Sequence, residues 1–260
     1  MNQVSSTLNS NNTSRSAIFF SPHPDDETLG CGGTIIKKKR AGFKIKVLFM
    51  TDGRKSHPHL ISEDELKRIR AKEALEVGRI LGLREEDILF LEYRDGELNT
   101  NQNSAIHKVS KILELEKPGE IFIPSRKEPS LWAKDHVATN RIVMSALQMY
   151  NKNIIVNEYP IWLWYNQPRI ERPSINIKAT MAGLMQVFIS YLILLKEFQY
   201  SVYVGDVLEI KGAALNQYRS QMTRLIPDSR WCTLRDLSNG KFLKCFFQEY
   251  EIFHRCTLNF

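Results

Sequence analysis

Residues 17–42 read AIFFSPHPDDETLGCGGTIIKKKRAG, and this stretch carries the main indication of the fold. Its apolar start is typical of a buried strand that ends at a loop, and the glycine-containing part indicates a turn that enters a helix. Further strands are expected at 44–53, 87–96, 120–125 and 153–162, and helices at 63–81, 105–115 and 135–150. We therefore predict an α/β protein with a Rossmann-like, mostly parallel sheet and helices on both faces.

The chain has 260 residues, 43% of them hydrophobic, which suits one large domain with a folded core. Residues 1–16 are polar and lack the apolar stretch of a secretory signal, so we expect a disordered lead-in. We assign residues 17–222 to the main domain and 223–260 to a C-terminal extension packed on it. Within this extension, the run 241–253 is expected to form a strand or hairpin arm at one side of the sheet.

The cysteines and the net charge limit the cellular location and the partners that we expect. The four cysteines (Cys31, Cys232, Cys245 and Cys256) form no CxxC pair, which fits a reducing compartment and predicts a cytoplasmic protein. The net charge of +7 favours anionic partners. No compact motif of basic and aromatic residues is present, so we expect no nucleic-acid partner.

Residues 179–195 form an uncharged, mostly apolar run of seventeen residues. About 20 apolar residues are needed to cross a bilayer, so we do not expect a membrane span. One interpretation is a core helix or a subunit contact in a homo-oligomer. The other is a helix in peripheral contact with a membrane surface, aided by the positive charge.

The loop after the first expected strand concentrates groups that bind metals. Zinc accepts imidazole nitrogen and carboxylate oxygen, so His23 and Asp26 are candidate ligands. His136 is the candidate third ligand, because it follows the fourth strand and reaches the same edge of a parallel sheet. Asp25 lies between the ligands and is the candidate general base, free to accept a proton from the bound water. The alternative is an acidic loop that caps the following helix.

The segment HPDDETLGCGGT (23–34) resembles the signature of the LmbE/PIG-L family of zinc-dependent N-acetylglucosaminyl deacetylases. The resemblance continues in family order to about residue 222, and so covers most of the chain. Its further motifs are Thr51-Asp52-Gly53, Arg70-x-x-Glu73-Ala74, Leu81-Gly82, Asp95-Gly96-x-Leu98, Asp135-His136, Glu158-Tyr159-Pro160-x-Trp162 and Lys211-x-x-Ala214-Leu215-x-x-Tyr218-x-Ser220-Gln221.

The resemblance implies a hydrolase that removes the N-acetyl group from an amino sugar and releases acetate. It places Zn2+ on the same three ligands and the general base at Asp25, with another divalent metal left open. It also implies that Arg70 and Asp95 hold the sugar, although a structural ion pair is the alternative for both. The sugar's attachment, including a phosphate or a lipid, is left open.

One position departs from the family pattern. Many members carry a histidine three residues before the third ligand, where this chain has Ala133. We hypothesise that His57, in the loop after the second strand, replaces it as a catalytic residue. The alternative is that His57 and His59 are loop residues without a role.

Other functions remain as alternatives. The same site fits a zinc amidase acting on another amide, such as a thiol conjugate or an antibiotic side chain, and also a non-catalytic sugar-binding relative. The glycine cluster at 30–33 suggests another alternative, a nucleotide-binding or methyl-transfer domain. Its spacing is not GxGxxG, and that interpretation leaves the preceding His-Pro-Asp-Asp unexplained.

Overall fold

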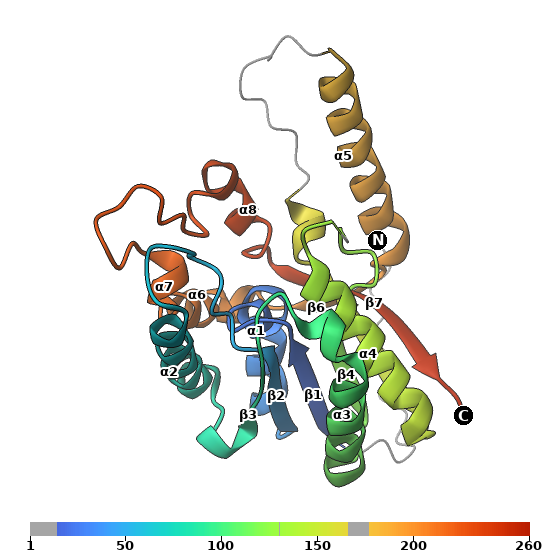
Figure 1. Cartoon of the computed structure of the whole chain (residues 1–260). Coiled ribbons are helices and arrows are strands. Elements are labelled where there is room, and N and C mark those ends of the chain that lie inside the picture. The colour runs from blue at the N-terminus through green and yellow to red at the C-terminus, as the bar shows by residue number, and fades with distance from the viewer. Residues whose placement is uncertain (1–14, 130, 166–176) are drawn as a thin grey trace.

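The computed structural model describes residues 15–129, 131–165 and 177–260 (Figure 1). The chain forms a seven-stranded sheet of order β3-β2-β1-β4-β5-β7-β6. Its strands are β1 (Ser16–Ser21), β2 (Lys44–Thr51), β3 (Ile88–Tyr93), β4 (Glu120–Pro124), β5 (Ile154–Tyr159), β6 (Tyr200–Tyr203) and β7 (Tyr250–Leu258). The expected α/β class and the five expected strands are confirmed.

The first five strands run parallel, and the order of the sheet reverses beside β1, which has β2 on one side and β4 on the other. The loops that leave the carboxyl ends of β1 and β4 therefore meet at a topological switch point. Open α/β sheets bind their ligands at such a point.

Helices cover both faces of the sheet, as expected (Figure 1). The helices of the described residues are α1 (Asp26–Arg40), α2 (Glu63–Leu81), α3 (Gln102–Glu116), α4 (Lys134–Tyr150), α5 (Ile177–Glu197), α6 (Leu208–Leu215), α7 (Arg219–Met222) and α8 (Lys241–Lys244). Alternate residues of β1 serve the two faces, because side chains alternate along a strand. Ala17 and Phe19 pack in the cluster that includes α1, α2 and α6, whereas Ile18 and Phe20 pack with α3 and α4.

The glycine cluster of α1 serves packing. A Cβ on Gly30 would lie 2.5 Å from a ring carbon of Tyr159, and one on Gly33 would lie 2.6 Å from Val204 Cβ. These glycines let α1 approach β5 and the segment after β6 closely. Close helix packing therefore accounts for them without a bound phosphate.

The C-terminal segment completes the sheet. β7 pairs antiparallel with both β5 and β6. The expected strand at 241–253 begins only at Tyr250, because 241–244 form the short helix α8. Glu251 of β7 accepts hydrogen bonds from the main-chain N–H groups of Gly33 and Thr34, each at 2.8 Å, and pairs with the buried Lys211 at 2.7 Å.

At the other end of the chain, residues 1–14 of the expected lead-in lie outside the described residues, and Ser16 already belongs to β1.

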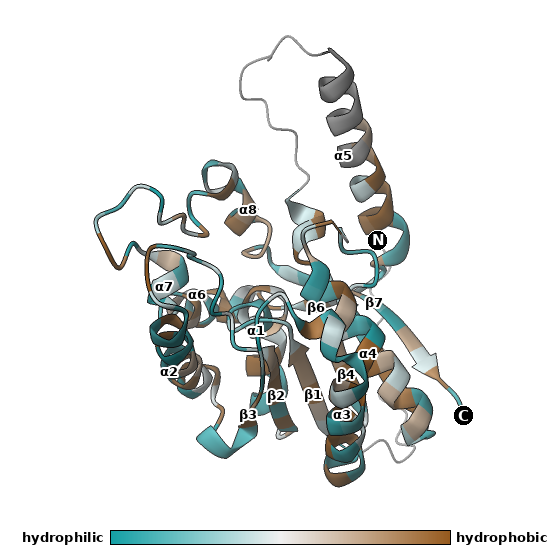
Figure 2. Cartoon of the chain, in the orientation of Figure 1, coloured by the Kyte–Doolittle hydropathy of each residue, from teal (hydrophilic) through white to brown (hydrophobic). Residues whose placement is uncertain are grey.

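Helix α5 contains the apolar run 179–195 and extends away from the sheet (Figures 1 and 2). From Met185 onward it exposes several large apolar side chains: Met185, Phe188, Ile189, Tyr191 and Leu195. Within the part of the chain that the structure describes, none of the helices combines the length and hydropathy needed to cross a bilayer.

Candidate active site

The loop between β1 and α1 is held in an unusual backbone conformation. Asp25 has φ 136°, a region that side-chain-bearing residues rarely adopt. Its N–H donates to the carboxylate of the buried Glu27 at 3.0 Å, and Tyr218 donates its hydroxyl to the same carboxylate at 2.8 Å. Strain of this kind persists only where the surroundings fix the chain, and it is common at active sites.

The three predicted metal ligands lie together. Asp26 Oδ2 lies 3.2 Å from His23 Nδ1 and 3.3 Å from His136 Nε2. One donor atom from each residue falls within 4.8 Å of the other two. Asp26 begins α1 and His136 lies in the first turn of α4, so two helix starts at the switch point bring these residues together.

The protonation state of His136 fits a cation in this cluster. Trp162 donates its indole N–H to His136 Nε2 at 3.1 Å, so this nitrogen is the unprotonated one, and it lies 3.3 Å from Asp26 Oδ2. A cation bound at Nε2 would take this lone pair, and the indole N–H would have to turn to another acceptor. His136 Nδ1 is buried without a hydrogen-bond partner. Burial lowers the pKa of His136 to about 4, which keeps the ring in the neutral form that binds metals. Two imidazoles and a carboxylate form a donor set that zinc accepts.

The far side of the His23 ring is held by two further carboxylates. His23 Nε2 lies 3.2 Å from Asp95 Oδ1 and 3.4 Å from Asp135 Oδ2, and Asp135 also accepts the N–H of Gly96 at 2.6 Å. Burial lowers the pKa of His23, but the three neighbouring carboxylates outweigh it and raise the pKa well above its ordinary value. Burial likewise raises the pKa of Asp95, but His23 outweighs it and holds the pKa low. Carboxylates in this position commonly fix a metal-binding histidine ring.

Asp25 and Arg70 form a buried pair next to the ligands. Arg70 Nη2 lies 3.1 Å from Asp25 Oδ2 and also donates to the Pro24 carbonyl, while Nη1 donates to Gly53 O at 3.1 Å. Burial raises the pKa of Asp25 to about 8 against the opposing charge of Arg70. A carboxylate with a raised pKa, fixed by a guanidinium, is suited to general acid–base chemistry near neutral pH.

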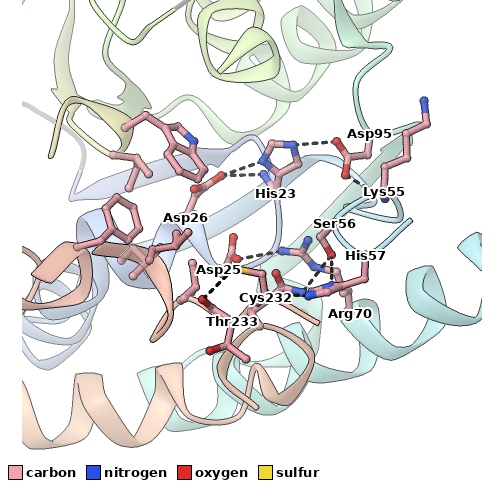
Figure 3. Close-up of a pocket in the computed structure, with 17 residues that line it drawn as sticks. His23, Asp25, Asp26, Lys55, Ser56, His57, Arg70, Asp95, Cys232 and Thr233 are labelled. Carbon is pink, nitrogen blue, oxygen red and sulfur yellow. Dashed lines mark hydrogen bonds and ion pairs between the residues drawn. The ribbon is translucent and has the colours of Figure 1, made fainter. Parts of the chain in front are cut away.

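A cavity of about 350 Å³ opens onto these groups (Figure 3). Six of the seven predicted site residues line it: His23, Asp25, Asp26, His57, Arg70 and Asp95. The seventh, His136, contacts Asp26 and Trp162, which line the cavity.

His57 lines the cavity with both ring nitrogens already engaged. Nε2 lies 3.0 Å from the carbonyl oxygen of Cys232, and Nδ1 lies 2.9 Å from Ser56 Oγ. The ring stacks on Trp231, with centroids 4.2 Å apart, and burial lowers the pKa of His57. A neutral ring with Nε2–H donating to Cys232 satisfies both contacts, which favours a positioning role for this histidine.

Several residues of the site escaped the sequence-based prediction. Asp135, next to His136 in sequence, contacts His23, and Trp162, at the end of a recognised motif, contacts His136. The carboxylate of buried Glu128 accepts the N–H groups of Ile161 and Trp162 at 2.5 and 2.8 Å and so holds the tryptophan. The signal for Asp135 and Trp162 was their place within the motifs, whereas Glu128 resembled an ordinary loop charge.

The fold and this site define an α/β protein with a candidate metal centre at the switch point of its sheet, beside a buried carboxylate able to move protons. Comparison of the sequence with protein-family models identifies the family. The chain belongs to the PIG-L family, described as GlcNAc-PI de-N-acetylase, whose model matches residues 18–147.

Two relatives are deacetylases by description. The chain is 25% identical over 221 residues to the diacetylchitobiose deacetylase of Thermococcus kodakarensis, covering 85% of this chain and 73% of the relative. It is 24% identical to the probable N-acetyl-alpha-D-glucosaminyl L-malate deacetylase 2 of Bacillus anthracis, covering 56% of this chain and 51% of that protein. The chain thus spans about half the length of the second relative.

Solved structures confirm the fold. The N,N'-diacetylchitobiose deacetylase from Pyrococcus horikoshii matches with a TM-score of 0.65 at 24% identity, over 93% of this chain and 84% of that one. GalB, the 4-carboxy-2-hydroxymuconate hydratase from Pseudomonas putida, matches with a TM-score of 0.57 at 15% identity, over 83% and 81%. A deacetylase and a hydratase share this fold, so the reaction must be argued from the site.

Proposed function

We propose that this protein hydrolyses the N-acetyl amide of an N-acetylglucosamine-type sugar and releases acetate. The observation that carries the proposal is the convergence of His23, Asp26 and His136 within one cluster beside the Asp25–Arg70 pair. Membership of a de-N-acetylase family supports the same reaction.

We assign a divalent cation, Zn2+ by its donor preferences, to His23, Asp26 and His136. When bound, it supplies positive charge that favours hydroxide at neutral pH and polarises the acetyl carbonyl. Asp95 and Asp135 hold the ring of His23 in place for this task.

Asp25 serves as the general base in this proposal. Its carboxylate accepts a proton from the attacking water, and the same carboxyl group then delivers that proton to the departing amine nitrogen. Arg70 orients the carboxylate through Oδ2 and opposes the effect of burial on its pKa. Arg70 lines the cavity, but it is only 2% exposed and bonds to two carbonyls, so its contact with the sugar stays a prediction.

Protonation of the amine by His57 also stays a prediction. Ala133, where the family resemblance implies a histidine, is buried and precedes the first residue of α4. For His57 to replace that histidine, its ring must leave the carbonyl of Cys232 or the hydroxyl of Ser56. Return of the proton through Asp25 needs no such movement.

Two kinds of group attached to the sugar fit the proposal, a phosphate and a lipid. Lys55 lines the cavity, and its Nζ lies 3.1 Å from Glu97 Oε1, so a phosphorylated sugar would compete with this carboxylate for the positive charge. The exposed apolar face of α5, together with the net charge of +7, suits peripheral contact with an anionic membrane that carries a lipid-linked sugar. The same face suits a homo-oligomer contact.

The four free cysteines suit a cytoplasmic location.

Flotation with phosphatidylserine-containing liposomes tests the membrane contact. The wild type is expected to float with the vesicles, and Phe188→Ser, which removes a 57% exposed ring, is expected to float less. Sedimentation equilibrium of both proteins without lipid tests the oligomer. Failure of the wild type to float, or equal flotation of both proteins, contradicts membrane contact through α5.

A substrate panel tests the reaction. Zinc-loaded protein is incubated with N-acetylglucosamine, its 1-phosphate and its glycosides, and with simple acetamides, and acetate is measured. The proposal is supported if the wild type releases more acetate from the sugars than the Asp25→Asn variant does. Release from simple amides alone favours the amidase alternative, and bound sugar without turnover favours a non-catalytic relative.

A further inference from the structure

The cavity has two chemically different walls. Lys55, Arg70 and Asp95 lie on one side and most of the unlabelled side chains lie on the other, with Asp25 and Asp26 between them (Figure 3). Six apolar residues contribute to the lining: Leu29, Ile161, Trp162, Leu234, Leu237 and Phe242. We call these six residues the apolar wall.

The apolar wall begins at the candidate metal cluster. Trp162 contacts His136 through its indole N–H and stacks on Phe242 with ring centroids 5.4 Å apart and an interplanar angle of 22°. Leu29 lies one helical turn after Asp26 in α1. An amide placed at the cluster therefore has apolar surface within a few ångströms of it.

The distal part of this wall is well anchored. Trp231 is fully buried and donates its indole N–H to Ser220 O at 3.0 Å, and the N–H of Leu234 donates to Gln221 O at 2.8 Å. Asp236 accepts both the N–H and the hydroxyl of Thr233 at 2.9 Å. A surface ordered before binding loses little conformational entropy when it binds a ligand.

A bare amino sugar makes poor use of such a wall, because hydroxyl groups pressed against apolar side chains lose water without gaining a partner. We propose that the apolar wall binds an apolar substituent of the amino sugar, carried at the glycosidic carbon or on the acyl group. This inference rests on the proposed deacetylation for its substrate. It adds that the preferred substrate is an amphiphilic sugar amide.

Binding without turnover tests the wall independently of the reaction. Calorimetric titration compares hexyl and methyl β-glucoside, which share the sugar and lack the amide. We expect the wild type to bind the hexyl compound at least about tenfold more tightly, since each methylene removed from water contributes roughly fourfold. Leu237→Gln is expected to lose most of this difference. Leu225→Gln, in the same segment but outside the cavity lining, is expected to keep it.

Equal binding of the two glucosides by the wild type, or the same loss in Leu225→Gln as in Leu237→Gln, overturns the inference. Kinetics then locate the substituent. Release of free amine is compared for the methyl and hexyl glycosides of N-acetylglucosamine and for methyl N-hexanoylglucosaminide. If kcat/KM is higher for the hexyl glycoside than for the methyl glycoside, the apolar substituent lies at the glycosidic carbon. If kcat/KM is higher for the hexanoyl amide, the apolar substituent lies on the acyl group.

The two proposals fail in different ways. If the methyl glycoside of N-acetylglucosamine is hydrolysed and neither longer compound gains in kcat/KM, the apolar wall is not a substrate site and the deacetylation stands. If no compound is hydrolysed by zinc-loaded protein, the proposed function fails, while the glucoside titrations still decide whether the wall binds apolar groups.

Discussion

The two walls of the cavity come from different parts of the chain. Every acidic, basic and histidine residue of the lining, from His23 to Asp95, precedes residue 147, within the part that the PIG-L model matches. Five of the six apolar residues follow residue 160. The residues proposed to carry out the reaction therefore lie in the matched region, whereas the wall proposed to select the substrate lies largely outside that region.

The walls are also stabilised differently. We call the acidic, basic and histidine residues of the lining the charged wall. It contains a strained residue, Asp25, and a buried guanidinium, Arg70. Both are unfavourable features that the surrounding hydrogen bonds must offset. The apolar wall rests on stacked rings and a buried Trp231, which stabilise the fold in their own right. We therefore expect changes in the charged wall to affect chemistry most, and changes near Trp231 to affect stability.

Removal of a metal ligand is expected to have the largest effect. In His136→Ala the cluster loses one of its two imidazoles, and activity should fall by roughly 10³-fold or more as the cation's charge is lost. Elemental analysis should show the metal content falling in parallel. His107→Ala, at an exposed position of α3, is the matched control. Full metal content and activity in His136→Ala would contradict the assigned centre.

Asp25→Asn separates the base from the metal site. Asparagine has the same shape as aspartate and so adds no backbone strain at this position, and the loop should keep its conformation. We expect kcat to fall by about 10²- to 10⁴-fold while metal content stays at the wild-type level. An Asp25→Asn enzyme with normal kcat would exclude this carboxylate as the base.

Asp95→Asn distinguishes two roles for one carboxylate. The contact with His23 Nε2 predicts that metal affinity falls by about 10- to 100-fold, measured by competition with a chelator. The role predicted from sequence, holding the sugar, predicts a higher KM with unchanged metal affinity. Asp206→Asn, in a surface ion pair with Lys37, is the control.

His57→Gln is expected to have the smallest effect on catalysis. Loss of the contacts to Cys232 and Trp231 should lower the free energy of unfolding by about 1–2 kcal/mol. Burial lowers the pKa of His57, so below its ordinary value of 6.5 the unfolded chain binds more protons than the folded one. The wild type should therefore lose stability with falling pH in this range more steeply than the variant.

The pH–rate profile tests the alternative role of His57. An unchanged kcat and basic limb in His57→Gln would remove this residue from the mechanism. A lost basic limb, at wild-type metal content, would establish the proton-transfer role predicted from the sequence.

Much of the fold was predictable because its signals are local. The helix at Glu63–Leu81 matches its expected range and ends at Gly82 with φ 85°, the left-handed cap that glycine favours. The strand or hairpin arm predicted at 241–253 begins later than expected, because 241–244 form the short helix α8. Apolar residues spread over so short a run do not separate a helical turn from a strand.

The order of strands and helices as far as β5 and the importance of the His-Pro-Asp-Asp loop could be taken from the sequence, whereas β6 was not expected. The sequence also indicated His136 as a partner, because parallel strands bring the loops at their carboxyl ends to one edge. The contacts of each side chain were found only in the folded chain. Asp95 lies against His23, Arg70 against Asp25, and His57 reaches a carbonyl 175 residues away. Such contacts depend on how distant segments pack, and no local pattern of residues encodes them.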